Sequence, residues 1–366
     1  MIAKITKAET KIVSVPLQRP VEGHPYLGRR ATSNFLLLQL RTDDGLDAFG
    51  LAHTSTVGKA RALEVMVNEL FPNLIGQSAL DHEQIYHRAY TFFTDLGHSG
   101  AALQALAAID IALWDLKGKA LQQPLHRLLG ARRDRVPCYA SGGLRRHQTI
   151  DQLVADAADF VKRGFGGMKL RLGARPFAED VERVRAVRDA IGSQVALMVD
   201  LNWSLTPPEA IRLGRMLEPF DLFWIEDPIA PDDIDGLAQV SRALDTRVTF
   251  GETLERIDQF RLCLEKQAAD CYMADVQKVG GISAWMRVAS LLGAWQRPLA
   301  SHTEPEVQVH LIAAAPNGLT VEYTPSHDVL YREPLKIENG LMLAPNKPGL
   351  GVEVNEDTIQ HYSVTA

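Results

Sequence analysis

The feature that most constrains the fold is an alternation of short apolar runs with amphipathic helical stretches, which begins at Val136 and continues to Thr324. The runs are "VPCYASGG", "GMKLRLG", "VALMVDLN", "LFWIEDP", "RVTFGET", "CYMADVQK", "RPLASHT" and "GLTVEYT". Stretches such as "AEDVERVRAVRDAIG" and "PPEAIRLGRMLE" lie between them and carry apolar residues at helical spacing. Eight such runs, each followed at roughly 20–30 residues by the next, predict an α/β barrel of the TIM type.

Two other regions flank this alternation. Residues 1–60 are predicted to be β-rich, because "AKITKAETKIVSVPL" and "NFLLLQLRTDDGLDAFGLA" have the pattern of hairpin strands with "TDDG" as a turn. Residues 58–130 carry helical patterns, among them "AALQALAAIDIALWDLKGKA". We therefore expect an α+β domain at 1–130, the barrel at 131–325, and a C-terminal segment at 326–366 that packs back on the N-terminal domain.

Composition narrows the class of partner. The formal net charge is −6 and no run of Lys or Arg is present, so we expect no nucleic-acid partner. Three scattered cysteines, Cys138, Cys263 and Cys271, do not make a disulfide framework or a thiolate metal site. Charges interrupt the N-terminal stretch, which argues against a signal peptide, and no stretch stays apolar for the roughly 18 residues of a membrane span. We expect a soluble cytoplasmic protein that binds a small molecule, has no membrane partner and forms a homo-oligomer.

Titratable residues end the second to the eighth predicted strands. Barrel enzymes build their sites at the C-terminal ends of the strands, so these side chains are expected to meet at one rim. In chain order they are Lys169 and Arg171, Asp200, Glu226, Glu252, Asp275, His302 and Glu322. A single acid at a strand end can simply cap the next helix, but capping does not require carboxylates and gives no reason for two cations.

Three of these residues predict a metal site. Asp200, Glu226 and Glu252 come from adjacent strands and offer only oxygen ligands, which suit Mg²⁺, whereas zinc more often recruits His or Cys. Lys169 and Arg171 point to the same face of the neighbouring strand. We interpret them as charges that balance the acidic cluster and meet an anionic substrate.

Asp275 and His302 predict a general base. They end neighbouring strands, so the carboxylate can accept a hydrogen bond from one imidazole nitrogen. That bond fixes the tautomer and raises the basicity of the other nitrogen.

Together these residues resemble the mandelate racemase subgroup of the enolase superfamily. The pattern that carries the resemblance is Lys169-x-Arg171, Asp200-x-Asn202, Glu226-Asp227-Pro228, Gly251-Glu252, Asp275, Gly280-Gly281, Ser301-His302 and Glu322. The N-terminal region is similar to the capping domain of that family, including "AIDIALWDLKGKA". The resemblance implies a modified TIM barrel of the (β/α)7β type with an N-terminal α+β capping domain.

The resemblance also implies roles for the rim residues. The three acids bind Mg²⁺, which holds the substrate carboxylate and stabilises the enediolate formed when the α-proton leaves. His302, oriented by Asp275, is the base. Glu322 lies where the family places a hydrogen-bonding group for a carboxylate oxygen, and Lys169 where it places a cation.

Arg171 departs from the family pattern. Its position usually holds a lysine that acts as a base on the other face of the substrate, but a guanidinium stays protonated and is a poor base. One base favours dehydration of an acid sugar, a mono- or diacid, to a 2-keto-3-deoxy acid. Two alternatives stay open: a racemase or epimerase of a 2-hydroxy acid that uses Lys169 as second base, and a non-catalytic carboxylate-binding barrel that keeps the metal for stability.

Specificity is expected from two stretches of the capping domain, the polar stretch 19–33, predicted to be a loop, and "AHTST" at 52–56. Cations and hydroxyl partners there would suit a polyhydroxy acid, although each residue could equally be a solvated loop residue. The residues assigned to substrate binding are His24, Tyr26 and Arg29, with Arg30 beside them, His53 from the second stretch, and Asn202 from the barrel.

Overall fold

A computed structural model of the chain describes residues 3–24 and 28–364. Its N-terminal part is a three-stranded antiparallel sheet of order β1 (Ile5–His24), β2 (Gly28–Thr42) and β3 (Asp47–Thr54). Five α-helices of the described chain follow, namely α1 (Val57–Glu69), α2 (Phe71–Leu74), α3 (His82–Phe92), α4 (Ala101–Ala120) and α5 (Leu125–Leu128). The α+β capping domain expected from the sequence is confirmed.

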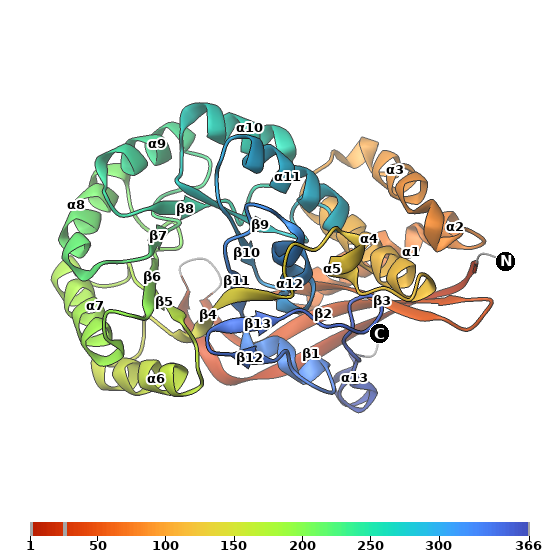
Figure 1. Ribbon diagram of the computed structural model, residues 1–366, viewed down its shortest axis with the longest axis horizontal. Coiled ribbons are helices and arrows are strands. Elements are labelled where there is room, and N and C mark those ends of the chain that lie inside the picture. The colour runs from red at the N-terminus through yellow and green to blue at the C-terminus, as the bar shows by residue number, and fades with distance from the viewer. Residues whose placement is uncertain (1–2, 25–27, 365–366) are drawn as a thin grey trace.

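The alternating part of the sequence forms eight parallel strands with a helix after each of the first seven, within the described residues. The strands are β4 (Arg135–Leu144), β5 (Gly167–Arg171), β6 (Ala196–Asp200), β7 (Trp224–Glu226), β8 (Val248–Phe250), β9 (Cys271–Asp275), β10 (Leu299–His302) and β11 (Val321–Tyr323). The helices are α6 (Ile150–Lys162), α7 (Phe177–Ile191), α8 (Pro207–Leu217), α9 (Ile234–Ala243), α10 (Ile257–Lys266), α11 (Ile282–Ala294) and α12 (Pro305–Ala314). Figure 1 shows the strands curling into a ring with these helices outside it.

The eighth strand closes the ring. β11 pairs in parallel with β4 on one side. On the other side, the amide of Leu319 donates to the carbonyl of Leu299 at 2.8 Å, and the amide of Ser301 donates to Thr320 at 3.1 Å. The (β/α)7β barrel is therefore confirmed.

The C-terminal segment returns to the capping domain. After a 3-10 turn (Pro325–Leu330), β12 (Ile337–Glu338) and β13 (Leu341–Leu343) extend the barrel sheet beyond β4. Helix α13 (Glu356–Tyr362) then lies beside β1, where the amide of Val364 donates to the carbonyl of Ile12 at 2.8 Å. In Figure 1 this blue segment overlaps the long strands β1 and β2, with α13 near the C-terminus.

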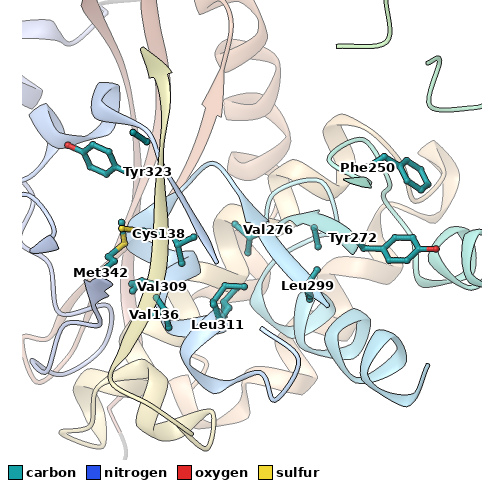
Figure 2. Close-up of a cluster of buried hydrophobic side chains, with 14 of the residues drawn as sticks. Val136, Cys138, Phe250, Tyr272, Val276, Leu299, Val309, Leu311, Tyr323 and Met342 are labelled. Atoms are coloured by element: carbon teal, nitrogen blue, oxygen red, sulfur yellow. The ribbon is translucent and has the colours of Figure 1, made fainter. Parts of the chain in front are cut away.

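Two apolar layers support the rim of the barrel. Between the strands and their covering segments lies a continuous core, part of which Figure 2 shows around Val136, Cys138, Leu299, Leu311 and Met342. The barrel interior is filled by a smaller cluster of Tyr139, Met198, Trp224, Cys271, Met273 and Ala300. Because the interior is packed, polar side chains at the strand ends are held at the mouth of the barrel.

A buried polar network joins the capping domain to the barrel. Asp110 on α4 is fully buried and accepts hydrogen bonds from the amide and hydroxyl of Ser283 at 2.9 and 2.8 Å. A Cβ atom at Gly281 would lie 2.5 Å from the Asp110 carboxylate, and Gly281 has a φ of +108°. The Gly280-Gly281 pair thus allows α4 to approach the start of α11 closely. No helix of the described residues is long and apolar enough to cross a membrane.

Candidate active site

The register of the parallel strands places the titratable residues of the rim at matching positions on neighbouring strands. Arg171 on β5 lies opposite Asp200 on β6, and Asp200 lies opposite Glu226 on β7. Across the mouth, Asp275 on β9 lies opposite His302 on β10. Side chains at matching positions of neighbouring parallel strands point the same way, so the predicted set meets in one place.

Lys169 lies at the centre of the acidic cluster. The side chain is 1% exposed, and its Nζ atom lies 2.9 Å from Glu322, 3.4 Å from Asp200 and in hydrogen-bond contact with Glu226. Burial lowers the pKa of Lys169, but Glu226 and the other two carboxylates outweigh it and hold the pKa well above its ordinary value. The two cations in "GMKLRLG" are thus explained by the acids that surround them.

Arg171 binds the edge of the same cluster. Its Nη1 atom donates to Asp200 and, at 2.8 Å, to the side-chain oxygen of Asn202. From the sequence alone, like-charge repulsion from Arg171 predicts a lowered pKa for Lys169; this prediction is wrong, because the nearer carboxylates dominate and raise the pKa. Asn202 therefore lies at the rim, as predicted, and is held there by Arg171.

The three predicted metal ligands are each paired with a cation of the chain. Asp200 contacts Arg171, Glu226 contacts Lys169, and Glu252 lies 2.9 Å from Nε2 of His302. Because each carboxylate is paired in this way, the ligand atoms of the three do not all lie within 4.8 Å of one another.

The rim nevertheless suits a hard divalent cation. The donor set is all oxygen, the ligand type that Mg²⁺ prefers. Burial, and the charges of Asp200, Glu322 and Glu252, raise the pKa of Glu226 to about 8 although Lys169 opposes them. The adjacent Asp227 has a buried Oδ2 atom without a hydrogen-bond partner in the described chain. A bound cation would offset this excess of negative charge.

The predicted dyad is present. Nδ1 of His302 lies 2.8 Å from Oδ2 of Asp275. The other oxygen of Asp275 accepts from the amides of Gln277 and Lys278 at 2.8 and 3.2 Å, which fixes the carboxylate. Nε2 of His302 consequently faces Glu252 and the cluster. Burial lowers the pKa of His302, but Glu252 and Asp275 raise it well above its ordinary value.

Glu322 is held rigidly beside Lys169. It is 1% exposed, accepts from the amide of Thr303 at 2.9 Å, and its own amide donates to the hydroxyl of Ser301 at 2.7 Å. Backbone strain also marks this rim: Asn202, Asp227 and Thr303, which lie one or two residues beyond strand ends, have φ of +41°, +47° and +51°. Such non-glycine residues cluster at functional sites.

A cavity of about 1300 Å³ lies between the rim and the capping domain. Barrel residues of its wall include Arg171, Glu252 and His302, and the capping domain supplies Arg30 and His53. The side-chain oxygen of Gln277 accepts from the amide of His53 at 2.6 Å, which ties β3 to the barrel. His53 therefore lies on the cavity wall, as its assignment requires.

The interpretation of residues 19–33 as a loop is wrong. β1 runs to His24 and β2 begins at Gly28, so residues 19–24 and 28–33 are paired strands, and residues 25–27 lie outside the described part of the chain. The prolines misled the prediction, but β1 is an edge strand, where proline is tolerated. Arg19 donates to Asp156 on α6 at 2.8 Å, so the hairpin contacts the barrel, as Figure 1 shows near β4 and β5.

The hairpin also decides which arginine faces the cavity. Arg30 lines the cavity, whereas Arg29 is exposed and lies 3.5 Å from Glu22, because neighbouring residues of a strand point to opposite faces. Of the other predicted residues, Tyr26 and the side chain of His24 lie outside the described part of the chain.

Sequence reasoning missed three residues of this region. Arg145, which follows β4, lines the cavity, and Glu304 and His327 follow β10 and β11. Within the described residues, His53, Glu304 and His327 form the group whose ligand atoms all lie within 4.8 Å of one another. The signal that could have found them is their position just beyond barrel strands, since site residues gather there.

Two family models match the chain. Residues 7–130 match the N-terminal domain of mandelate racemase and muconate lactonizing enzyme, and residues 152–358 match the enolase C-terminal domain-like family.

The chain is also similar to named proteins along nearly all of its length. It is 35% identical to L-talarate/galactarate dehydratase of Salmonella typhimurium, over 99% of this chain and 92% of the relative. It is 32% identical to 3,6-anhydro-α-L-galactonate cycloisomerase of Streptomyces coelicolor, over 98% and 99%. A crystal structure of the Salmonella dehydratase with Mg and L-lyxarohydroxamate superimposes with a TM-score of 0.95, at 33% identity over 100% of this chain and 94% of that one.

Proposed function

This chain belongs to the mandelate racemase and muconate lactonizing enzyme family of the enolase superfamily, and from that premise we propose that it is a Mg²⁺-dependent acid-sugar dehydratase. The reaction removes the α-proton of a sugar carboxylate and expels the β-hydroxyl as water, which gives a 2-keto-3-deoxy acid after tautomerisation. The observation that carries the proposal is the His302–Asp275 dyad, held at 2.8 Å beside the three carboxylates of the rim.

Asp200, Glu226 and Glu252 would hold the Mg²⁺. When bound, the cation supplies a Lewis acid that attracts the substrate carboxylate and favours the charge that develops as the α-proton leaves. The family and its Mg-containing relatives support this assignment.

His302 takes the α-proton at Nε2. Its Nδ1–H donates to Asp275, and Nε2, which lies 2.9 Å from Glu252 in the metal-free chain, would be available as base once Glu252 holds the Mg²⁺. The same imidazole can then give its proton to the departing hydroxyl. Lys169 supplies a fixed positive charge, and Glu322, held by the amide of Thr303, offers a hydrogen-bonding group to a substrate oxygen.

Dehydration is favoured over racemisation because the other face of the substrate lacks a second base. Arg171 stays protonated at any ordinary pH. Lys169 contacts three carboxylates, Asp200, Glu226 and Glu322, which hold it as a fixed charge within the cluster.

We assign the substrate to the diacid class. Arg30 and Arg145 line the cavity, and neither forms an ion pair within the described chain. The Nε atom of Arg30 is buried without a hydrogen-bond partner. Burial and the neighbouring Arg171 lower the pKa of both guanidinium groups, so the three cations are crowded together. A second carboxylate would be bound there by charge-assisted hydrogen bonds.

The test is a screen of mono- and diacid sugars with Mg²⁺, read out as semicarbazide-reactive 2-keto acid. It includes 3,6-anhydrogalactonate, because one relative is a cycloisomerase of that compound. We expect an aldaric acid to give the product, and none from a His302→Asn control. Epimerised substrate without any 2-keto acid would support a racemase instead, and no α-proton exchange with any acid would support a non-catalytic binding protein.

Location and assembly remain part of the proposal. The three cysteines are free thiols, which is consistent with a reducing cytoplasm. The homo-oligomer expected from the sequence is checked by light scattering of the purified protein.

A further inference from the structure

Three residues from distant parts of the sequence meet beside the cavity, outside the acidic cluster. His53 comes from β3 of the capping domain, Glu304 from the start of α12, and His327 from the 3-10 turn after β11. One ligand atom of each lies within 4.8 Å of the others. The rings of His53 and His327 are 5.2 Å apart and meet edge to face.

Polar atoms of this group are buried without partners. His327 is fully buried; its Nε2 atom has no partner within the described residues, and its Nδ1 atom lies 3.6 Å from Glu306. Glu304 is also fully buried, and its Oε1 atom lacks a partner. A buried polar group without a partner costs about 1–3 kcal/mol. We therefore expect a bound water molecule or ion between these atoms.

The remaining atoms of the three side chains are oriented by neighbours. Nε2 of His53 lies 2.8 Å from the hydroxyl of Ser33, so its Nδ1 is the nitrogen left for a ligand. The carboxylate of Glu306 lies 3.6 Å from Nδ1 of His327, which leaves Nε2. Oε2 of Glu304 accepts from the hydroxyl of Thr303, which leaves Oε1. Outer partners on the second nitrogen of a histidine are typical of metal ligands.

We propose that His53, Glu304 and His327 form a second metal site, which takes Zn²⁺. Two imidazoles and one carboxylate are a donor set that zinc binds with a fourth position open, whereas Mg²⁺ prefers oxygen alone. The site is distinct from the rim, since Nε2 of His302 faces Glu252 and not this group. The open position lies at the wall that His53 and Thr303 give to the cavity, where water or a substrate hydroxyl can bind.

The bound ion also fastens the capping domain to the barrel. One ligand belongs to β3, and the other two follow β10 and β11. The metal thus fixes His53 at the cavity wall and limits movement of β3 relative to the rim.

The experiment isolates this site by working in a Glu226→Gln background, which removes one carboxylate of the rim. The chelator-treated protein is titrated with Zn²⁺ against a chromogenic chelator, and in parallel with Co²⁺ while the visible spectrum is recorded. We expect one Zn²⁺ per chain and the strong visible absorption of Co²⁺ with four or five ligands. A further Glu304→Gln or His327→Asn substitution weakens Zn²⁺ binding at least about 10-fold.

Matched controls are Glu338→Gln and His98→Asn. Glu338 is exposed on β12, and His98 stacks on Tyr90 away from the group, so both variants retain Zn²⁺. Circular dichroism shows whether each variant folds. If a ligand variant does not fold, the Co²⁺ spectrum of the parent decides. Only the weak absorption of six-coordinate Co²⁺, no retained Zn²⁺, or equal Zn²⁺ affinity in folded ligand variants would overturn the proposal and leave buried water as the partner of these atoms.

Discussion

The acidic rim of the barrel differs from the wall of the same cavity, defined by Arg30 of the capping domain and Arg145 after β4, in how charged side chains are paired. At the rim, Lys169 and Arg171 are each bonded to carboxylates, and Nδ1 of His302 to Asp275. On the wall, Arg30 and Arg145 have no carboxylate partner in the described chain. A paired charge is held in one geometry, which suits catalysis. An unpaired buried charge is available to bind an anionic group of the substrate, which suits substrate selection. The comparison predicts that rim changes reduce kcat and wall changes raise KM.

The largest effect is expected from His302→Asn. Loss of the base lowers kcat by about 10⁴-fold, the upper end for general base catalysis, while Mg²⁺ binding is retained. Steady-state kinetics and calorimetric Mg²⁺ titration measure the two. Deuterium exchange at the normal rate in this variant would mean that another group is the base, with Lys169 the first to examine.

Glu226→Gln follows. Removal of one carboxylate is expected to abolish Mg²⁺ binding and to lower activity by about 10³-fold, because a Lewis acid contributes several kcal/mol. Metal analysis after gel filtration measures the loss, with Glu209→Gln, an exposed residue that caps α8, as control. Full activity of the parent enzyme after exhaustive EDTA treatment would contradict the metal assignment.

Arg30→Gln tests whether the cavity wall binds a second carboxylate of the substrate. It is expected to raise KM for a diacid by about 10- to 100-fold and to leave kcat and monoacid kinetics nearly unchanged, because a charge-assisted hydrogen bond is worth about 1.5–3 kcal/mol. Arg29→Gln is a matched control on the opposite face of the same strand. Equal effects of the two substitutions would refute the role of the wall.

Arg171→Lys is expected to have the smallest effect. The charge is kept, but the shorter lysine side chain places it differently from the Nη1 atom that contacts both Asp200 and Asn202, so kcat falls about 10-fold. A new ability to epimerise the substrate would show that this position decides between one base and two. Unchanged kinetics would show that the guanidinium is dispensable.

The contrast between rim and wall also explains what the sequence could predict. The rim was predictable because the strand period and barrel topology place every strand end at one mouth, and Asp200, Glu226 and His302 lie there as expected. The wall depends on the β1–β2 hairpin, whose prolines are typical of a loop. The sequence therefore could not predict which face of a strand Arg29 and Arg30 occupy.

Residues that follow the strands were harder still. Glu304 and His327 are separated from His53 by more than 250 positions in the sequence, and only the docking of the capping domain brings them together. Likewise, the pKa of Lys169 depends on three carboxylates from three other strands, so its direction could not be read from the neighbouring Arg171 alone.

A single base, His302, acts on one face of the substrate in the proposed reaction. Proton NMR of α-deuterium incorporation in D₂O, with both α-epimers of a substrate identified by the screen, tests this directly. We expect exchange in the epimer whose α-proton faces His302 and none above background in the other. Comparable exchange in both epimers would refute the single base and establish a second base opposite His302.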